Sequence, residues 1–317
     1  MTVFSNFGKY GIVGAGGGPA IFLTNCYMIA GGGGGGGYGG GGAGGYRELV
    51  DQEFINGNSY SVTIGAGGTQ GTPMPSPSIA AQGIATSIIG TNINIASSGG
   101  GGGGQEGPGP NALLGGQPGG SGGGGGAVNP GSPNRIGGTG NKGGYSPVEG
   151  YAGGNGSQVG PLPSFDPYCG GGGGGAGGVG ESSPGAPAPA GRVAGDGGAG
   201  INPPIFGPVG GGGGGGIFST GLAGAAGPHG GGAGGSYYGT HGNPGTSPQR
   251  QGDNAPGANR GGGGGAGGWY LNPRGSGSSG KVIIRYLTAQ GTKSGGSVST
   301  AGSYTIHTFT SSGTFST

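Results

Sequence analysis

The sequence predicts a mostly irregular, all-β protein in which a bundle of polyglycine II helices, joined by variable loops, is flanked by short β-strands at both chain ends. Almost no α-helix is expected, because no segment combines a 3.6-residue apolar period with helix caps. Strand-like segments lie toward the two ends of the chain. Glycine makes up 105 of the 317 residues and recurs in six bare runs, at residues 31–37, 99–104, 122–126, 170–175, 210–216 and 261–265.

The glycine runs could be disordered or packed. A glycine run loses much backbone entropy on folding and buries no side chain, which favours a flexible linker. Linkers join recognisable domains, however, and none lies between these runs. A glycine helix of the polyproline II type has three residues per turn, so its N–H and C=O groups point sideways in three directions. Without Cβ atoms, neighbouring helices can bond to each other, each bond contributing about 1 kcal/mol. We therefore expect a packed array, with disorder as the alternative.

Composition excludes several classes of protein. One-third glycine is typical of collagen, but runs of five to seven glycines break its strict period of three. Hydrophobic residues reach 29 % and charged residues 6 %, so a large apolar core and a charge-driven disordered tail are both poor fits. The net charge is +2 and no Lys/Arg cluster occurs, so no nucleic-acid partner is expected. The longest apolar stretch, residues 21–30, is too short to span a bilayer, and no signal-peptide pattern is found, so neither membrane insertion nor Sec export is expected.

The first part of the chain, residues 1–98, is predicted to be β-rich and to contain the first glycine run and a hairpin. Residues 21–29 have strand composition and lead into that run. Two strand-like segments, residues 46–54 and 60–64, flank an Asn-Gly pair, which is a strong hairpin signal. Residues 84–95 alternate weakly and are expected to form a further strand or edge.

The rest of the chain divides into two further parts. Residues 99–280 are predicted to be the glycine-rich polyglycine II bundle with variable loops. Residues 281–317 are predicted to be C-terminal β-strands, because residues 281–287 are rich in β-branched residues and residues 303–309 alternate.

Catalytic and metal-binding patterns are missing from the sequence. Cys26 and Cys169 follow no metal or redox spacing and are interpreted as small buried hydrophobes, with a disulfide between them left open. The three histidines share no ligand spacing, and the carboxylates are few and scattered. We therefore expect no catalytic residue, no metal and no cofactor, and a protein that is not an enzyme.

Recognition of a partner by surface loops is the class of function that remains. Aromatic residues together with Arg, Asn and Ser are favoured at binding surfaces because they give a large contact area at a low entropy cost. The alternative is that the aromatic residues cap the ends of the glycine helices. The candidate receptor-binding residues are Phe165, Tyr168, Phe206, Phe218, Tyr237, Tyr238, His241, Trp269, Tyr270 and Arg274.

Five segments stand out by their sequence and their order: residues 27–30 before the first glycine block, 44–48, 58–68, 280–286 and 304–315. Together they resemble the glycine-rich domain of bacteriophage tail-fibre and receptor-binding proteins. The broader arrangement is similar to the adhesins at the tips of T-even-type long tail fibres, in which layered polyglycine II helices carry variable loops that contact a host receptor.

The resemblance implies a phage virion protein, in the tail fibre or as a receptor-binding component, which adheres to the bacterial surface through loops on a rigid polyglycine scaffold. Its implied partners are a bacterial surface receptor, either an outer-membrane protein or a polysaccharide, and other tail-fibre or virion proteins. A homotrimer and a single copy are both consistent with the resemblance. The implied location is the phage tail, outside cells. The alternative is a purely structural subunit of a virion or an extracellular filament, whose loops bind neighbouring copies.

Overall fold

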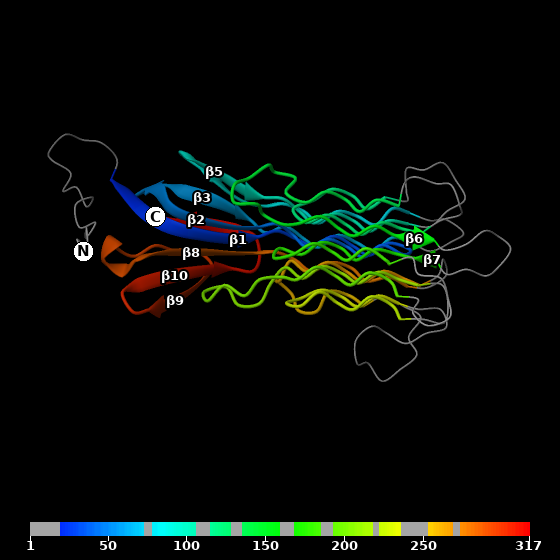
Figure 1. The fold of residues 1–317 in the computed structure, drawn as a ribbon. Helices are drawn as coiled ribbons and strands as arrows, with labels where there is room; N and C mark the ends of the chain where they lie inside the picture. Colours follow the sequence, from blue (N-terminus) through cyan, green and yellow to red (C-terminus); the bar gives the residue numbers. More distant parts are fainter. Residues whose placement is uncertain are drawn as a thin grey trace, which may run out of the picture.

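The computed structural model shows an elongated molecule with β-sheets at one end and extended segments running away from them (Figure 1). Within the described residues there is no α-helix, and the helical structure is limited to a 3₁₀ turn at Thr288–Gln290. The nearly all-β class predicted from the sequence is therefore confirmed. The structure describes residues 20–72, 78–105, 115–127, 135–158, 168–184, 193–217, 222–235, 253–268 and 273–317.

The larger sheet combines the two ends of the described chain. Its five antiparallel strands follow the order β2, β1, β8, β10, β9. The predicted strands in these regions are confirmed, since β-branched and aromatic side chains pack well on a pleated surface. The strands are β1 (Ile21–Ile29), β2 (Tyr46–Ile55), β8 (Lys281–Leu287), β9 (Ser297–Ala301) and β10 (Tyr304–Phe309).

The smaller sheet has four antiparallel strands in the order β11, β3, β4, β5. The weakly alternating residues 84–95, predicted as a single strand or edge, contain the hairpin of β4 and β5. This hairpin turns at Asn92, whose φ of 59° is a left-handed value that asparagine tolerates well. The strands are β3 (Ser59–Thr63), β4 (Thr86–Gly90), β5 (Ile93–Ser97) and β11 (Gly313–Ser316).

The hairpin predicted at Asn56-Gly57 is wrong, because β2 and β3 belong to different sheets. The pair forms a corner at which the chain crosses from the larger to the smaller sheet. Tyr60 fixes the corner, since its hydroxyl accepts a hydrogen bond from the Ile55 N–H at 2.8 Å. The Gly57 N–H donates to the Thr317 carbonyl at 2.9 Å, so the last residue of the chain covers the turn. The Asn-Gly pair specifies a turn. Whether the strands on either side of the turn pair with each other depends on how their side chains pack in the core.

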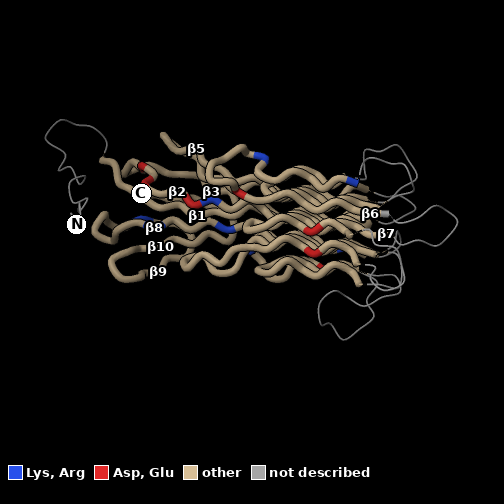
Figure 2. The backbone as a smooth tube through the Cα atoms, in the orientation of Figure 1, with Lys and Arg blue, Asp and Glu red and all other residues tan. Residues whose placement is uncertain are grey.

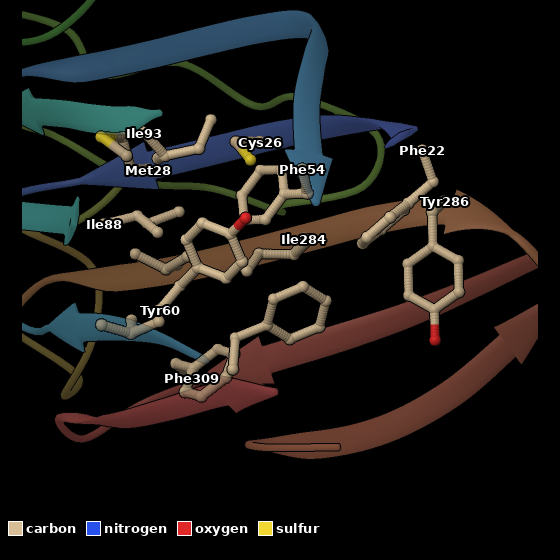
Figure 3. Packing of buried hydrophobic residues seen from close by; sticks show 13 residues of the cluster. Phe22, Cys26, Met28, Phe54, Tyr60, Ile88, Ile93, Ile284, Tyr286 and Phe309 are labelled. Carbon is tan, nitrogen blue, oxygen red and sulfur yellow. The ribbon is translucent and has the colours of Figure 1, made fainter. Parts of the chain in front are cut away.

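That core lies between the two sheets and is rich in aromatic residues (Figure 3). Phe54 lies at its centre, with ring centroids 4.5 Å from Tyr60 and 5.7 Å from Phe315. Alternate residues of β1, including Cys26 and Met28, point into this core. Cys26 is free and fully buried, and burial raises the pKa of its thiol to about 12. Cys169 is also buried but belongs to a different cluster, so the two cysteines are small buried hydrophobes, as one interpretation of the sequence held.

The glycine run after β1 shows how the extended segments are joined. Successive N–H groups of residues 31–36 donate to three different segments in turn and then repeat the cycle. The carbonyl groups of the same run accept from three further segments, at residues 65–72, 99–105 and 261–268. The direction of bonding therefore repeats every three residues. The donor–acceptor pairs are 31 to 84, 32 to 278, 33 to 42, 34 to 81, 35 to 275 and 36 to 39.

We call each of these extended, laterally bonded segments a rod. Residues 38–45 behave in the same way, since they donate to three segments and accept from three others. Rods that are surrounded by bonded neighbours in this way are buried along their whole length, and they contain most or all of each of the six bare glycine runs. We call them the inner rods: residues 31–36, 38–45, 100–105, 121–126, 170–175, 210–216 and 261–267.

At the glycine positions of the inner rods, the neighbouring rods lie so close that a side chain does not fit. A Cβ atom built on Gly33 would lie 2.1 Å from the carbonyl oxygen of Gly101, and one on Gly40 would lie 2.0 Å from that of Gly213. Real Cβ atoms essentially never come within 3.0 Å of such neighbours, and a backbone atom cannot swing aside. Glycine is therefore required at these positions, although the inner rods also contain the fully buried Ala43 and Ala266.

Rods at the surface of the bundle, which we call outer rods, contain residues other than glycine but keep the three-residue repeat of the inner rods. Along residues 222–227 the buried residues include Gly224 and Gly227, whose N–H groups donate to Gly215 and Gly212 of an inner rod, whereas Leu222 is exposed. Each outer rod has neighbours on one side only, so every third position faces inward and the others can carry side chains. The mixed segments between the bare runs therefore include rods as well as loops.

Candidate recognition surface

Several rods end at the same level, at the end of the bundle remote from the two larger sheets. We call this the loop end; the short strands β6 (Ser157–Gln158) and β7 (Tyr168–Cys169) lie there (Figure 1). The turn at Tyr38 marks its level, because Gly216 donates to the Tyr38 carbonyl at 2.7 Å and Gly39 donates to Gly104 at 3.0 Å. Residues 105 and 217 are the last described residues before two of the gaps, so these rods leave the bundle side by side.

A small apolar cluster fixes the rods at the loop end. Cys169, Ala194, Ile217 and Ala223 pack together, and Ile217 is fully buried. Cys169 also pairs with Ile217 in an antiparallel bridge, which ties β7 to an inner rod. Side-chain packing here supplements the backbone hydrogen bonds, so the positions at which the chain leaves the bundle are held rigidly.

Tyr168 is the predicted contact residue that the structure places at the loop end. It belongs to β7, is partly exposed, and its ring centroid lies 6.2 Å from that of the buried Tyr38. An aromatic ring backed by a second ring is well suited to a contact, because its orientation is set in advance. Seven other candidates lie outside the described residues: Phe165, Phe218, Tyr237, Tyr238, His241, Trp269 and Tyr270.

Phe206 has a different position, where the bundle meets the larger sheet. It is buried with Tyr27, Ile29 and Ile283, and its ring is edge-on to that of Tyr46 with centroids 5.6 Å apart. The Lys281 ammonium lies 4.2 Å from the Phe206 ring centroid and donates to its backbone oxygen at 2.9 Å. Burial and the nearby Arg260 lower the pKa of Lys281. Phe206 therefore fastens the bundle to the sheet and leaves little surface for a ligand.

Arg274 is also buried, although the sequence places it in an aromatic loop. Its guanidinium Nη1 donates to the carbonyl of Gly71 at 3.1 Å, and the residue is only 3 % exposed. Gly71 lies next to the gap at residues 73–77, so Arg274 ties together two rods near the loop end. Its position supports a structural role beneath the loops more than a direct contact.

A buried carboxylate that sequence reasoning passed over lies at the opposite end of the bundle. Glu149 is fully buried, and its Oε2 accepts hydrogen bonds from the Ser98 N–H at 2.8 Å and the Ser97 hydroxyl at 3.3 Å. Its Oε1 accepts from the Gly143 N–H at 3.1 Å. A single glutamate in an irregular segment gives no signal in the sequence. Because donors surround both oxygens, Glu149 joins β5 to the bundle as a structural residue.

The described surface carries few charges, and Figure 2 shows them scattered over both ends and the bundle. Within the described residues, no group of three or more His, Cys, Asp or Glu is placed to hold a metal ion. A search of the same residues finds no helix long and apolar enough to cross a membrane.

In comparisons with known proteins, no family model, no curated protein and no solved structure matched the chain.

Proposed function

We propose that this protein is a phage virion component, in the tail fibre or as a receptor-binding protein, which adheres to a bacterial surface through loops at the loop end of a rigid polyglycine II bundle. The observation that carries the proposal is the three-residue cycle of hydrogen-bond directions along the inner rods. A stiff support built from glycine has an evident use in carrying recognition loops, which are most effective on a rigid scaffold.

The polyglycine II assignment is supported by the period and by the number of neighbours. A helix with three residues per turn points its N–H groups in three directions, and residues 31–36 and 38–45 both do so. Each of these rods has six bonded neighbours, as expected when identical helices pack side by side. With each bond contributing about 1 kcal/mol, the lattice compensates for the high entropy cost of ordering glycine.

Recognition at the loop end is supported by the arrangement of the rods. Their ends are held by backbone bonds, by the apolar cluster around Ile217 and by the buried Arg274. A support that is ordered before binding lowers the entropy cost of contact. The aromatic content of the intervening segments, which includes Trp269 and the Tyr237-Tyr238 pair, then supplies contact area.

The proposal is tested by the binding of the purified full chain to intact cells, outer-membrane vesicles and purified lipopolysaccharide from a panel of Gram-negative strains. In one variant, residues 237–241 and 269–272 are replaced by Gly and Ser without a change in length. Arg274 is kept because it is buried. Ile89→Ser, at a half-exposed position of β4, is the control at the other end of the molecule.

We expect the wild type and Ile89→Ser to bind at least one strain and the loop variant to lose about tenfold or more in affinity, because aromatic anchors dominate such interfaces. Circular dichroism spectra of the three proteins should agree. Equal binding by all three proteins would contradict the assignment of the loops. Polymerisation of the wild type without cell binding would favour the structural filament subunit.

A further inference from the structure

One sheet edge in the described chain has no protection. β9 is the last strand of the larger sheet, and all five of its residues are exposed. β9 pairs with β10 on one side, and no other described residue hydrogen-bonds to its backbone. Its sequence, Ser-Val-Ser-Thr-Ala, contains no charge and no proline. Charges, prolines, bulges and covering segments are the usual devices that prevent an edge strand from pairing with another chain.

The other three edges of the two larger sheets are covered. β2 and β5 protect each other, since the Asn92 side chain donates to the Glu53 carbonyl at 2.7 Å and Arg47 donates to the Ala96 carbonyl at 2.5 Å. The Asp51 backbone, with a φ of 52°, further interrupts the β2 edge. The β11 edge is occupied by Ser294, which exchanges two backbone hydrogen bonds with Ser316 at 2.9 and 3.0 Å. β9 therefore differs from every other edge of these two sheets.

We propose that β9 is a pairing surface for a second copy of this chain, and that the two copies join antiparallel strands across a two-fold axis. The pairing that uses all five residues places Ser299 opposite the same residue of the second copy and Val298 opposite Thr300. No like charges then face each other, and β-branched residues form the cross-strand pairs. A two-fold contact of this kind is closed, so it yields a dimer and no fibre. The inference does not depend on the proposed function.

The direction of the strands fixes the shape of the dimer. β1 runs straight into the rod of residues 31–36, so the strands of the larger sheet lie along the bundle (Figure 1). A two-fold axis perpendicular to an antiparallel sheet reverses this direction, which places the two loop ends at opposite poles. Five residues bury less area than a standard stable interface, so the dimer forms in a concentration-dependent way.

The test is sedimentation equilibrium of the full chain over a range of concentrations, with four proteins besides the wild type. Ser299→Lys and Ser299→Glu each place two like charges opposite each other at the axis. An equimolar mixture of these two variants places opposite charges there instead. Ser61→Lys makes the same change at an exposed position of β3, which is an internal strand of the smaller sheet, and serves as the matched control. Thr300→Lys adds a charge to the edge away from the axis.

We expect the wild type and Ser61→Lys to shift from 29.1 kDa toward twice that mass as concentration rises. Each Ser299 variant alone should weaken association about tenfold, and the mixture should restore it, because opposite charges in cross-strand pairs stabilise and like charges destabilise. Thr300→Lys should weaken association less than Ser299→Lys. A wild type that stays monomeric at the highest concentration, a trimer, or association insensitive to Ser299→Lys would each overturn the proposal.

Discussion

The inner rods make a sharp prediction about glycine substitutions, and Gly173→Ala is its clearest case. Gly173 donates to the Gly213 carbonyl at 2.8 Å and accepts from the Gly198 N–H at 2.8 Å. A Cβ at this position would lie 2.0 Å from the carbonyl oxygen of Gly41, where ordinary contact begins at 3.4 Å. Two rods must therefore separate by roughly 1.4 Å, the difference between these distances. Because both rods are bonded on all sides, the separation breaks bonds in several directions.

The energetic cost follows from the groups that lose their partners. A buried N–H or C=O left unpaired costs about 1–3 kcal/mol, so the loss of two such groups costs about 2–6 kcal/mol. Replacing glycine by alanine also lowers the conformational entropy of the unfolded chain, and this effect raises the free energy of unfolding by about 0.4–1 kcal/mol. The free energy of unfolding should therefore fall by about 1–5.6 kcal/mol, a large share of the total of about 5–15 kcal/mol that is usual for folded proteins.

Gly178→Ala is the matched control, because the same change is made in the turn that follows the same rod. A Cβ on Gly178 would lie 3.5 Å from its nearest neighbour, the Ala199 nitrogen, which is an ordinary contact. We expect this variant to equal the wild type or to be up to about 1 kcal/mol more stable. Urea unfolding followed by circular dichroism measures both variants. If Gly173→Ala unfolds at the same urea concentration as Gly178→Ala, the close packing of the inner rods is refuted.

Three further predictions concern the amides, a buried acid and a buried histidine. Hydrogen exchange measured by NMR should be slower at the amides of Gly33, Gly42 and Gly173 than at the exposed Val179, because bonded amides inside the lattice open only with the rods around them. Glu149→Gln should lower the free energy of unfolding by about 1–3 kcal/mol, since an amide NH₂ then faces an N–H donor, and urea unfolding checks this. Burial lowers the pKa of His307 below 6.5, so the unfolded chain takes up protons first and stability falls as the pH drops below about 6.5. Urea unfolding from pH 7.5 to 4.5 should show a weaker pH dependence for His307→Gln, and an unchanged slope would contradict the assignment.

His307 illustrates what the sequence could predict in the sheets. The alternation in residues 303–309 predicted a strand, and the structure places His307 in β10. The alternation could not identify the hydrogen-bond partners of His307, because both lie elsewhere in the chain. In the structure, Nδ1 donates to the Gly295 carbonyl at 2.6 Å and Nε2 accepts from the Tyr286 hydroxyl at 3.1 Å. Local alternation specifies a strand, whereas contacts between distant segments are fixed by the whole fold. The corner at Asn56-Gly57 was mispredicted for the same reason.

The candidate site was less predictable than the strands. Phe206 stands in a Pro-rich segment that resembles an exposed loop, yet its turn folds back and buries the ring against the sheet. Arg274 follows an aromatic segment, yet its charge is used inside the bundle. Composition shows that a segment is irregular, but it cannot show which side of that segment faces solvent. Tyr168 is the candidate whose placement at the end of a rod could be anticipated, because only Cys169 separates it from the bare glycine run at residues 170–175.

The composition of a rod reflects how many neighbours surround it, as two of the rods show. Along residues 210–216, where bonded rods lie on all sides, every position is glycine. Along residues 222–227, glycine stands at the inward positions 224 and 227, and other residues occupy several of the remaining ones. Insertion of one residue into either rod would rotate all later N–H groups by about a third of a turn, away from their acceptors, whereas three residues restore the direction. Changes in length are therefore compatible with the bundle only between rods.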